Sequence, residues 1–191
     1  MGGYRQQAGD QILDRAAAVL ARRGARTSVQ EIADAVGLSK AGLQHHFPTK
    51  DSLHAAVLAK VAGIGQQVLD VVAGLPIGPE RDLRAVEALI DVALAHPGLV
   101  SLLLAPVGTA AGDEEAEATQ ASATAALAAF GVDPETAAPE RTVRVSAALA
   151  ALGVLTLAAH QKDLTVAWRP HIVLACFDAL GHRRPVPTPE A

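Results

Sequence analysis

Seven histidines and one cysteine are the side chains of this sequence best suited to binding a metal or to catalysis. His45 and His46 are adjacent, so on a helix they point about 100° apart, unlike the i, i+4 pairs of zinc-binding helices. His160, His171 and Cys176 have no metal-ligand spacing. The sequence also lacks the motifs of nucleophilic, zinc-dependent and phosphate-binding enzymes. We therefore expect no metal site and no catalytic residue, and predict that the chain is not an enzyme.

Charge is distributed unevenly along the chain, whose formal net charge is -4. Residues 1–60 hold eight lysines and arginines against five acidic residues, a balance of +3, whereas the remainder has a balance of -7. Attraction to phosphates depends on the local patch rather than on the total charge. The pattern therefore favours a nucleic-acid contact confined to the N-terminal part, although chance variation of surface charge would produce it too.

Residues 28–47 predict two short helices joined by a glycine turn, which is the arrangement of a helix-turn-helix. Ser28 can cap the first helix, Glu31 completes a capping box, and Gly37 permits the positive φ of the turn. The second helix is expected over Lys40–His46. Apolar residues at helical spacing would bury the seam between the two helices: Val29, Ile32, Ala33, Val36, Leu38, Leu43 and Phe47.

The exposed face of the second helix has the residue types that a DNA-reading helix needs. Ala41 and Gly42 keep the start of the helix slim enough for its backbone to approach base edges. Gln44 and His45 can offer hydrogen bonds there, and Lys40 completes the face. Many helical pairs with this spacing never touch DNA, so a helical adaptor that binds only protein is the alternative at this point.

A more specific pattern runs through the first 53 residues. It consists of Ile12, Leu13, Leu20, Gly24, Thr27, Glu31, Ile32, Ala33, Ala35, Gly37, Ser39, Lys40, Leu43, His46, Phe47, Lys50 and Leu53. This pattern resembles the N-terminal signature of the tetracycline-repressor (TetR) family of transcriptional regulators, whose C-terminal domains share helical architecture without a common sequence. The resemblance implies a homodimeric repressor, a palindromic double-stranded DNA operator, and a small-molecule effector that releases the DNA.

Residue by residue, the resemblance implies a set of DNA-contacting positions. They are Ser28, Gln30, Ser39, Lys40, Ala41, Gly42, Gln44, His45, His46 and Lys50. His46 and Lys50 would bind phosphates, and Ser28 and Gln30 would also reach the DNA backbone. At Gln44 the family usually has tyrosine. Glutamine lacks the ring, which puts a phosphate contact in doubt, but its amide can pair with adenine.

The remainder of the chain predicts an all-α fold. Half of the residues are hydrophobic but only 3% are aromatic, so the core must consist mainly of aliphatic side chains. Apolar residues follow helical spacing between glycine and proline breaks, with no stretch of period two. Helices are expected at about residues 6–23, 80–95, 98–105, 113–130, 139–160 and 170–180, with a connecting helix over 51–73.

These helices suggest two units and a tail. We expect a helix-turn-helix DNA-binding domain over residues 1–50, a helical ligand-binding and dimerisation domain over 51–181, and a disordered, proline-rich tail over 182–191. The N-terminus has no apolar core for a signal peptide, and the longest apolar run, Val145–Ala159, is shorter than the roughly 20 residues of a membrane span. We therefore expect a cytoplasmic protein without a membrane partner.

The expected C-terminal helices bear on dimerisation and on effector binding. Helix 139–160 is hydrophobic almost all round, which fits burial by its own domain on one side and by a second subunit on the other. Ile172, Cys176 and Phe177 are candidates for the same seam, although a monomeric core helix would also explain the pattern. We expect no cofactor but a small, largely apolar effector in a pocket lined by residues 80–160, held by aliphatic contacts because aromatic residues for stacking are few.

Overall fold

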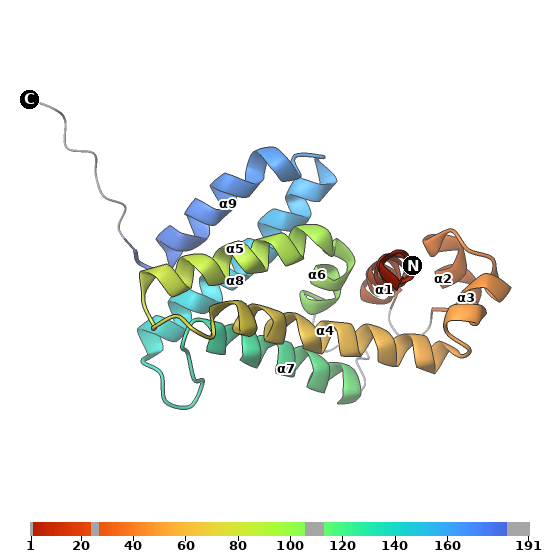
Figure 1. Cartoon of the computed structure of the whole chain (residues 1–191), viewed down its shortest axis with the longest axis horizontal. Helices are drawn as coiled ribbons and strands as arrows, with labels where there is room; N and C mark the ends of the chain where they lie inside the picture. Colours follow the sequence, from red (N-terminus) through yellow and green to blue (C-terminus); the bar gives the residue numbers. More distant parts are fainter. Residues whose placement is uncertain (1, 24–26, 106–112, 183–191) are drawn as a thin grey trace, which may run out of the picture.

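The computed structural model describes residues 2–23, 27–105 and 113–182, and within these ranges the chain forms nine helices and no strand (Figure 1). The predicted all-α class is confirmed. Helix α4 runs along the molecule, with α2 and α3 at one end and α8 and α9 towards the other. The helices are α1 (Gly2–Arg23), α2 (Val29–Val36), α3 (Lys40–His46), α4 (Lys50–Val72), α5 (Pro79–Ala95), α6 (Pro97–Leu103), α7 (Asp113–Ala129), α8 (Pro139–Gln161) and α9 (Thr165–Ala179).

The helix ends agree with the predicted ones within two residues, except at the starts of α1 and α9. Helix α9 begins at Thr165 and contains Pro170, at which the predicted helix 170–180 begins. Proline cannot donate to the carbonyl oxygen four residues earlier, which here belongs to Val166, an 87% exposed residue in the first turn of the helix. Gly24, the residues between the expected helices 98–105 and 113–130, and tail residues 183–191 lie outside the described residues.

Two clusters of buried side chains make up the core, and α4 contributes to both. Val57 and Val61 of α4 belong to the first cluster, with buried residues of α1, α2 and α3. Val68 and Val72, further along α4, belong to the second cluster, with residues of α5, α7, α8 and α9. The helix-turn-helix and the C-terminal helices are therefore built on one continuous helix.

Close packing of α7 on α4 depends on small residues. A Cβ atom added at Gly65 would lie 2.5 Å from the carbonyl oxygen of Ser122 and 2.7 Å from the Cβ of Ala125. Figure 1 shows α4 and α7 side by side, and their contact is the most extensive between any two of the described helices. Gly65 is thus a position where α7 approaches the backbone of α4 closely.

The outer faces of α8 and α9 expose apolar side chains. On α8 these include Val143 and Val154, which are 67% and 59% exposed. The prediction that Ile172 and Cys176 face a second subunit is wrong, because both side chains are buried in the core of their own chain. Helical periodicity shows that a helix is apolar on several faces but does not show which neighbour covers each face.

Two of the described helices, α4 and α8, are long and apolar enough to cross a membrane, judged by length and composition alone. The bent pair α5 and α6 would also qualify if it were one span. The apolar run Val145–Ala159 alone is shorter than a membrane span, whereas the whole of α8 comprises 23 residues. In the fold, α4 packs against α1, α5 and α7, and α8 packs against α5, α6 and α9.

Candidate nucleic-acid interface

Helix α2 begins with the predicted capping box. The hydroxyl of Ser28 accepts a hydrogen bond from the Glu31 backbone N–H at 3.2 Å, and a Glu31 carboxylate oxygen accepts one from the Ser28 N–H at 2.8 Å. Hydrogen bonds from the Ser28 backbone and hydroxyl hold the pKa of Glu31 below its usual range, with Arg23 adding to the effect. Glu31 and Arg23 also form an ion pair, which ties the start of α2 to the end of α1.

The turn between α2 and α3 is formed by Gly37, whose φ of 75° lies in the left-handed region. The Leu38 N–H donates to the Ala33 carbonyl oxygen at 2.9 Å, which closes the end of α2. Leu43 on α3 is 1% exposed and packs into the same core cluster as Ile32 and Ala33. The glycine turn and the buried seam predicted for the helix-turn-helix are thus present.

Helix α3 presents its polar side away from this seam. Ser39 caps it, since its hydroxyl accepts a hydrogen bond from the Gly42 N–H at 3.0 Å. Gly42 is half-buried beside this cap. The exposed residues of α3 are Lys40, Ala41, Gln44, His45 and His46.

The start of α4 lies directly after α3 in the chain. Thr49 caps it through a reciprocal pair with Ser52: the Ser52 N–H donates to the Thr49 hydroxyl at 3.0 Å, and the Thr49 N–H donates to the Ser52 hydroxyl at 3.1 Å. This places the half-buried Lys50 in the first turn of α4, where the helix N-terminus also favours anions. On α2, the amide of Gln30 donates to Asp34 at 2.7 Å.

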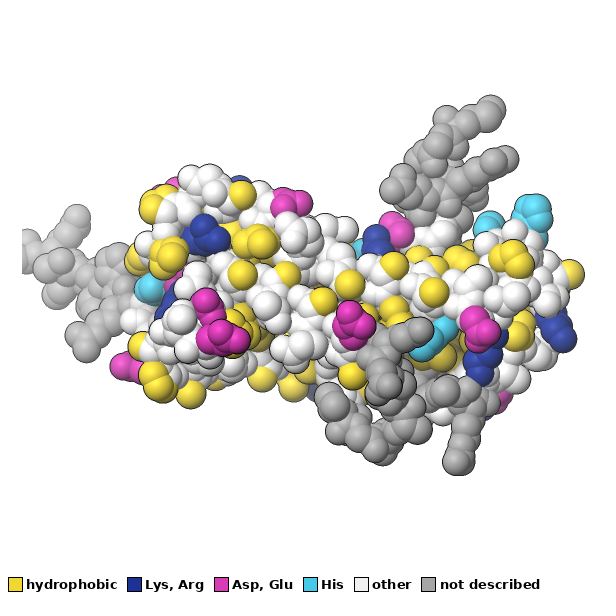
Figure 2. All heavy atoms as spheres, turned by 90° about the horizontal axis from the view of Figure 1, so that it is seen from below, with side chains coloured by type: hydrophobic (Ala, Val, Ile, Leu, Met, Phe, Trp, Pro, Cys, Tyr) yellow, Lys and Arg dark blue, Asp and Glu magenta, His cyan; other side chains and the backbone are white. Residues whose placement is uncertain are grey.

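All ten residues proposed from the sequence lie on α2 or α3, at the N-caps of these two helices, or, for Lys50, in the first turn of α4. Figure 2 shows lysine, arginine and histidine side chains at this end of the molecule. The DNA contacts of these ten residues stay a prediction. Ser28 is engaged in the predicted capping box, and the amide of Gln30 is engaged by Asp34, which the sequence pattern did not indicate.

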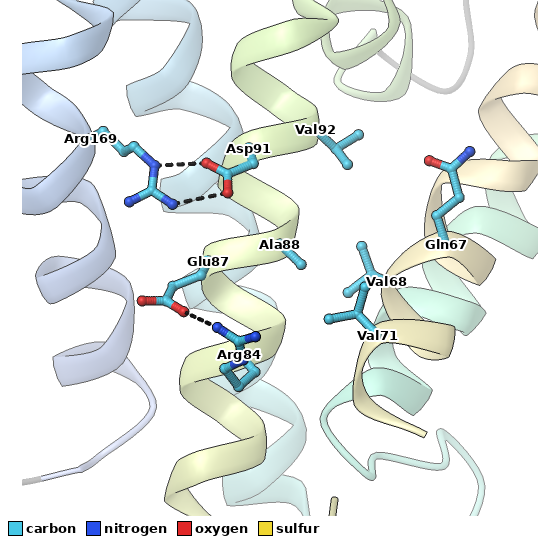
Figure 3. Close-up of a pocket in the computed structure, with 9 residues that line it drawn as sticks. All are labelled: Gln67, Val68, Val71, Arg84, Glu87, Ala88, Asp91, Val92 and Arg169. Carbon is cyan, nitrogen blue, oxygen red and sulfur yellow. Dashed lines mark hydrogen bonds and ion pairs between the residues drawn. The ribbon is translucent and has the colours of Figure 1, made fainter. Parts of the chain in front are cut away.

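A groove of about 630 Å³ lies between α4 and α5 in the C-terminal part. Figure 3 shows two ion pairs beside it: Arg169 of α9 binds Asp91 at 2.7 and 2.9 Å, and Arg84 binds Glu87 at 3.3 Å. Aliphatic side chains lie between the two helices. The complete lining is Gln67, Val68, Val71, Arg84, Glu87, Ala88, Asp91, Val92 and Arg169. It is more polar than the expected pocket and draws on α4 and α9, outside residues 80–160.

Cys176 is a core residue. Its thiol lies 3.6 Å from the Ala148 carbonyl oxygen, to which it donates a hydrogen bond, and burial raises its pKa to about 11. The thiol is therefore protonated near neutral pH and a poor nucleophile. In the part of the chain that the structure describes, no three histidine, cysteine, aspartate or glutamate side chains are grouped as a metal site.

Comparison with known proteins adds a family match for this end of the molecule. Residues 12–57 match the model of the bacterial regulatory proteins of the tetR family. No curated protein sequence matches the chain.

Solved structures match nearly the whole chain. A TetR family transcription regulator from Marinobacter aquaeolei VT8 is 22% identical, with a TM-score of 0.60, over 94% of this chain and 98% of that one. The fatty acid degradation regulator FadR from Bacillus halodurans is 16% identical, with a TM-score of 0.54, over 92% and 99% of the two chains. These likenesses show that the nine helices are arranged as in those regulators.

Proposed function

We propose, from the premise that residues 12–57 of this chain are a TetR-family DNA-binding domain, that the protein is a homodimeric transcriptional repressor of a palindromic operator, released from DNA by a small molecule. The observation that carries the proposal is the polar face of α3. This face is exposed because Leu43, on the other side of the helix, is buried and because the turn at Gly37 sets the direction of α3. A helix presented in this way can enter the major groove. We expect the protein to act in the cytoplasm.

Within this interface we assign two kinds of contact. Lys40, Ala41 and Gly42 at the start of α3 approach the bases, and Gln44 reads one base pair through its amide. Residues at the start of α2, the N-cap and last residue of α3, and the first residue of α4 anchor the DNA backbone, which fixes the register without reading sequence. These anchoring residues are Ser28, Gln30, Ser39, His46 and Lys50, with His45 on the border between the two groups.

Replacing Lys50 and Gln44 separately should distinguish anchoring from reading. Lys50→Ala is expected to weaken binding to all duplexes alike and to reduce the slope of log affinity against log salt by about one unit, because one phosphate contact is lost. Gln44→Ala is expected to leave that slope unchanged and to cost about 1 to 3 kcal/mol at one base-pair position, because a neutral amide releases no counterion. Fluorescence anisotropy at several salt concentrations measures both.

The duplex for these titrations is one selected by the wild-type protein from a random-sequence pool, with a scrambled duplex as the reference. If Gln44→Ala weakens both duplexes equally, Gln44 contacts the backbone, as tyrosine would at this position. If the wild-type protein prefers no duplex and instead retains a protein partner in a pull-down, the helical adaptor is the better interpretation.

The proposed dimer contact is the exposed apolar side of α8 and α9. Val154 of α8 is 59% exposed, and Leu174 of α9 is 39% exposed. Val154→Lys is expected to give a monomer at micromolar concentration, because a charge would be buried in the apolar contact. Val71→Lys is the matched control, since Val71 is similarly exposed at 53% but lies on α4. Light scattering decides: a monomeric wild type, or a dimeric Val154→Lys, contradicts this interface.

For the effector we propose the groove between α4 and α5. Its aliphatic side chains suit an apolar body, and its charged rim suits one polar group. A molecule that releases DNA must bind the non-binding conformer more tightly, and a hundredfold preference corresponds to about 2.7 kcal/mol. Val71 lines the groove, so Val71→Trp, which fills part of it, is expected to weaken the release of DNA by the effector. Release that is unaffected by Val71→Trp would place the effector elsewhere.

A further inference from the structure

Helix α6 packs into the core of the helix-turn-helix although it comes from the C-terminal half of the chain. Leu99 and Leu102 are 0% and 4% exposed and belong to the same buried cluster as Ile12, Leu20 and Leu43. The contact between α1 and α6 is among the most extensive in the fold. This short helix is therefore a direct connection between the DNA-binding end and the rest of the molecule.

Asp14 of α1 holds the first turn of α6. Its Oδ1 accepts a hydrogen bond from the Leu99 backbone N–H at 3.0 Å, across 85 positions of sequence. The cap residue of α6, His96, makes no side-chain capping bond, so Asp14 supplies the acceptor that this helix end needs. Burial raises the pKa of Asp14, and this is opposed by hydrogen bonds from Leu99 and Gly98 and by the nearby His96.

The backbone of α6 also lies directly on α1 at this point. A Cβ atom added at Gly98 would be 1.8 Å from the Asp14 carbonyl oxygen and 3.1 Å from the Ala18 nitrogen. Glycine is therefore required for the two helices to approach this closely. Because the neighbouring atoms are backbone, they cannot move aside as a flexible side chain would, and the position of α6 on α1 is sharply defined.

The corner between α5 and α6 is held from the opposite side by α8. The Nε2 of His160 donates to the Leu94 carbonyl oxygen at 2.6 Å. The corner is thus bound to α1 through Asp14 and to α8 through His160, and α8 carries the exposed apolar side that includes Val154. One short segment therefore links the proposed dimer contact to the helix-turn-helix.

We propose that Asp14 is a positioning residue for DNA binding: by capping α6 it sets the orientation of the helix-turn-helix relative to α8, and hence the separation of the two α3 helices in the dimer. The inference rests on the proposed function, because only a dimer on two half-sites requires a defined separation. Asp14 itself lies apart from the ten residues assigned to the DNA. Its effect is on spacing rather than on base recognition.

The experiment measures the separation directly. A spin label at Ala35→Cys, on the exposed side of α2, reports the distance between the two protomers, and the buried Cys176 thiol does not compete for the label. The wild type is expected to give one narrow distance distribution and Asp14→Ala a broad one. Asp14→Asn, which keeps an oxygen acceptor for Leu99, should restore the narrow distribution. Asp10→Ala is the matched control, because Asp10 is also an acidic residue of α1 but binds Lys60 of α4, at 3.1 Å, rather than α6. This variant should keep the narrow distribution.

A second measurement uses DNA. The wild type should bind its selected duplex at least about tenfold more tightly than the same duplex with one base pair inserted at the centre, and Asp14→Ala should lose most of this preference. If Asp14 were merely stabilising, Asp14→Ala would lower the unfolding midpoint without changing this preference. His160→Ala loosens the corner from the other side, leaves α1 intact, and should also broaden the distances.

Three results would overturn the proposal. In the first, Asp14→Ala unfolds at lower denaturant but keeps the wild-type distances and spacing preference. In the second, Asp14→Ala does not fold and His160→Ala keeps the narrow distribution. In the third, the wild type itself shows no interprotomer distance or binds no duplex, in which case the proposed function fails as well. The first two leave dimerisation and DNA binding standing, so the two kinds of failure are distinguishable.

Discussion

Replacing Gly98 by alanine is expected to lower the free energy of unfolding by about 3 kcal/mol, at the upper end of the usual cost of overpacking. The added Cβ would fall 1.8 Å from the Asp14 carbonyl oxygen, so α6 must move away from α1. That movement breaks the hydrogen bond from Leu99 to Asp14 and exposes the buried Leu99. Urea unfolding followed by circular dichroism measures the loss.

Gly63→Ala provides the matched control. Gly63 lies inside α4, and a Cβ atom there meets nothing within 4 Å. Alanine is the better helix former, so this change is expected to raise the free energy of unfolding by about 0.5 to 1 kcal/mol. If Gly98→Ala behaved like Gly63→Ala, α6 would not be packed on α1 as described. The proposed link through α6 between the helix-turn-helix and α8 would then be wrong as well.

Arg141→Leu is expected to destabilise the protein by about 3 kcal/mol, because it leaves a buried carboxylate without its main partner. Asp82 of α5 is 1% exposed, and Arg141 Nη2 donates to its two oxygens at 2.7 and 2.8 Å and to the Phe130 carbonyl oxygen at 2.9 Å. His182 remains at 2.6 Å, which keeps the loss at the lower end of the range for buried pairs.

The control for Arg141 is one turn away on the same helix. Arg144 binds Glu140 at 2.9 Å in an exposed i, i+4 pair, and its replacement by leucine should cost less than about 1 kcal/mol. Both variants remove one arginine from α8, so they differ mainly in the burial of the acidic partner. Equal unfolding midpoints for the two variants would mean that Asp82 gains little from Arg141.

The helix-turn-helix could be predicted because its determinants are local. Ser28, Gly37 and Ser39 act within a few residues of themselves, as caps and as a turn, and Leu43 follows from helical spacing. The class of fold and most helix ends followed from the same kind of signal. These features depend on sequence neighbours, so a single sequence contains the information needed.

The connection between the two ends of the molecule could not be predicted. The sequence predicts a helix over 98–105 but not that Gly98, at its start, lies where the backbones of α6 and α1 meet. The pairing of Asp14 with Leu99 joins positions 85 apart, and no periodicity encodes such a partner. The same limit applies to Ile172, whose apolar character did not reveal that its own chain covers it. The groove combines α4, α5 and α9 for the same reason.

Selection of duplexes from a random-sequence pool by the wild-type protein tests the central claim most directly. A dimer that presents two α3 helices should enrich a sequence with two-fold symmetry, whose half-sites lie about one helical turn or a multiple of it apart. Each bound duplex should carry both protomers of the dimer, as measured by analytical ultracentrifugation. Enrichment of no sequence, or of one asymmetric half-site bound by a single chain, would contradict the account.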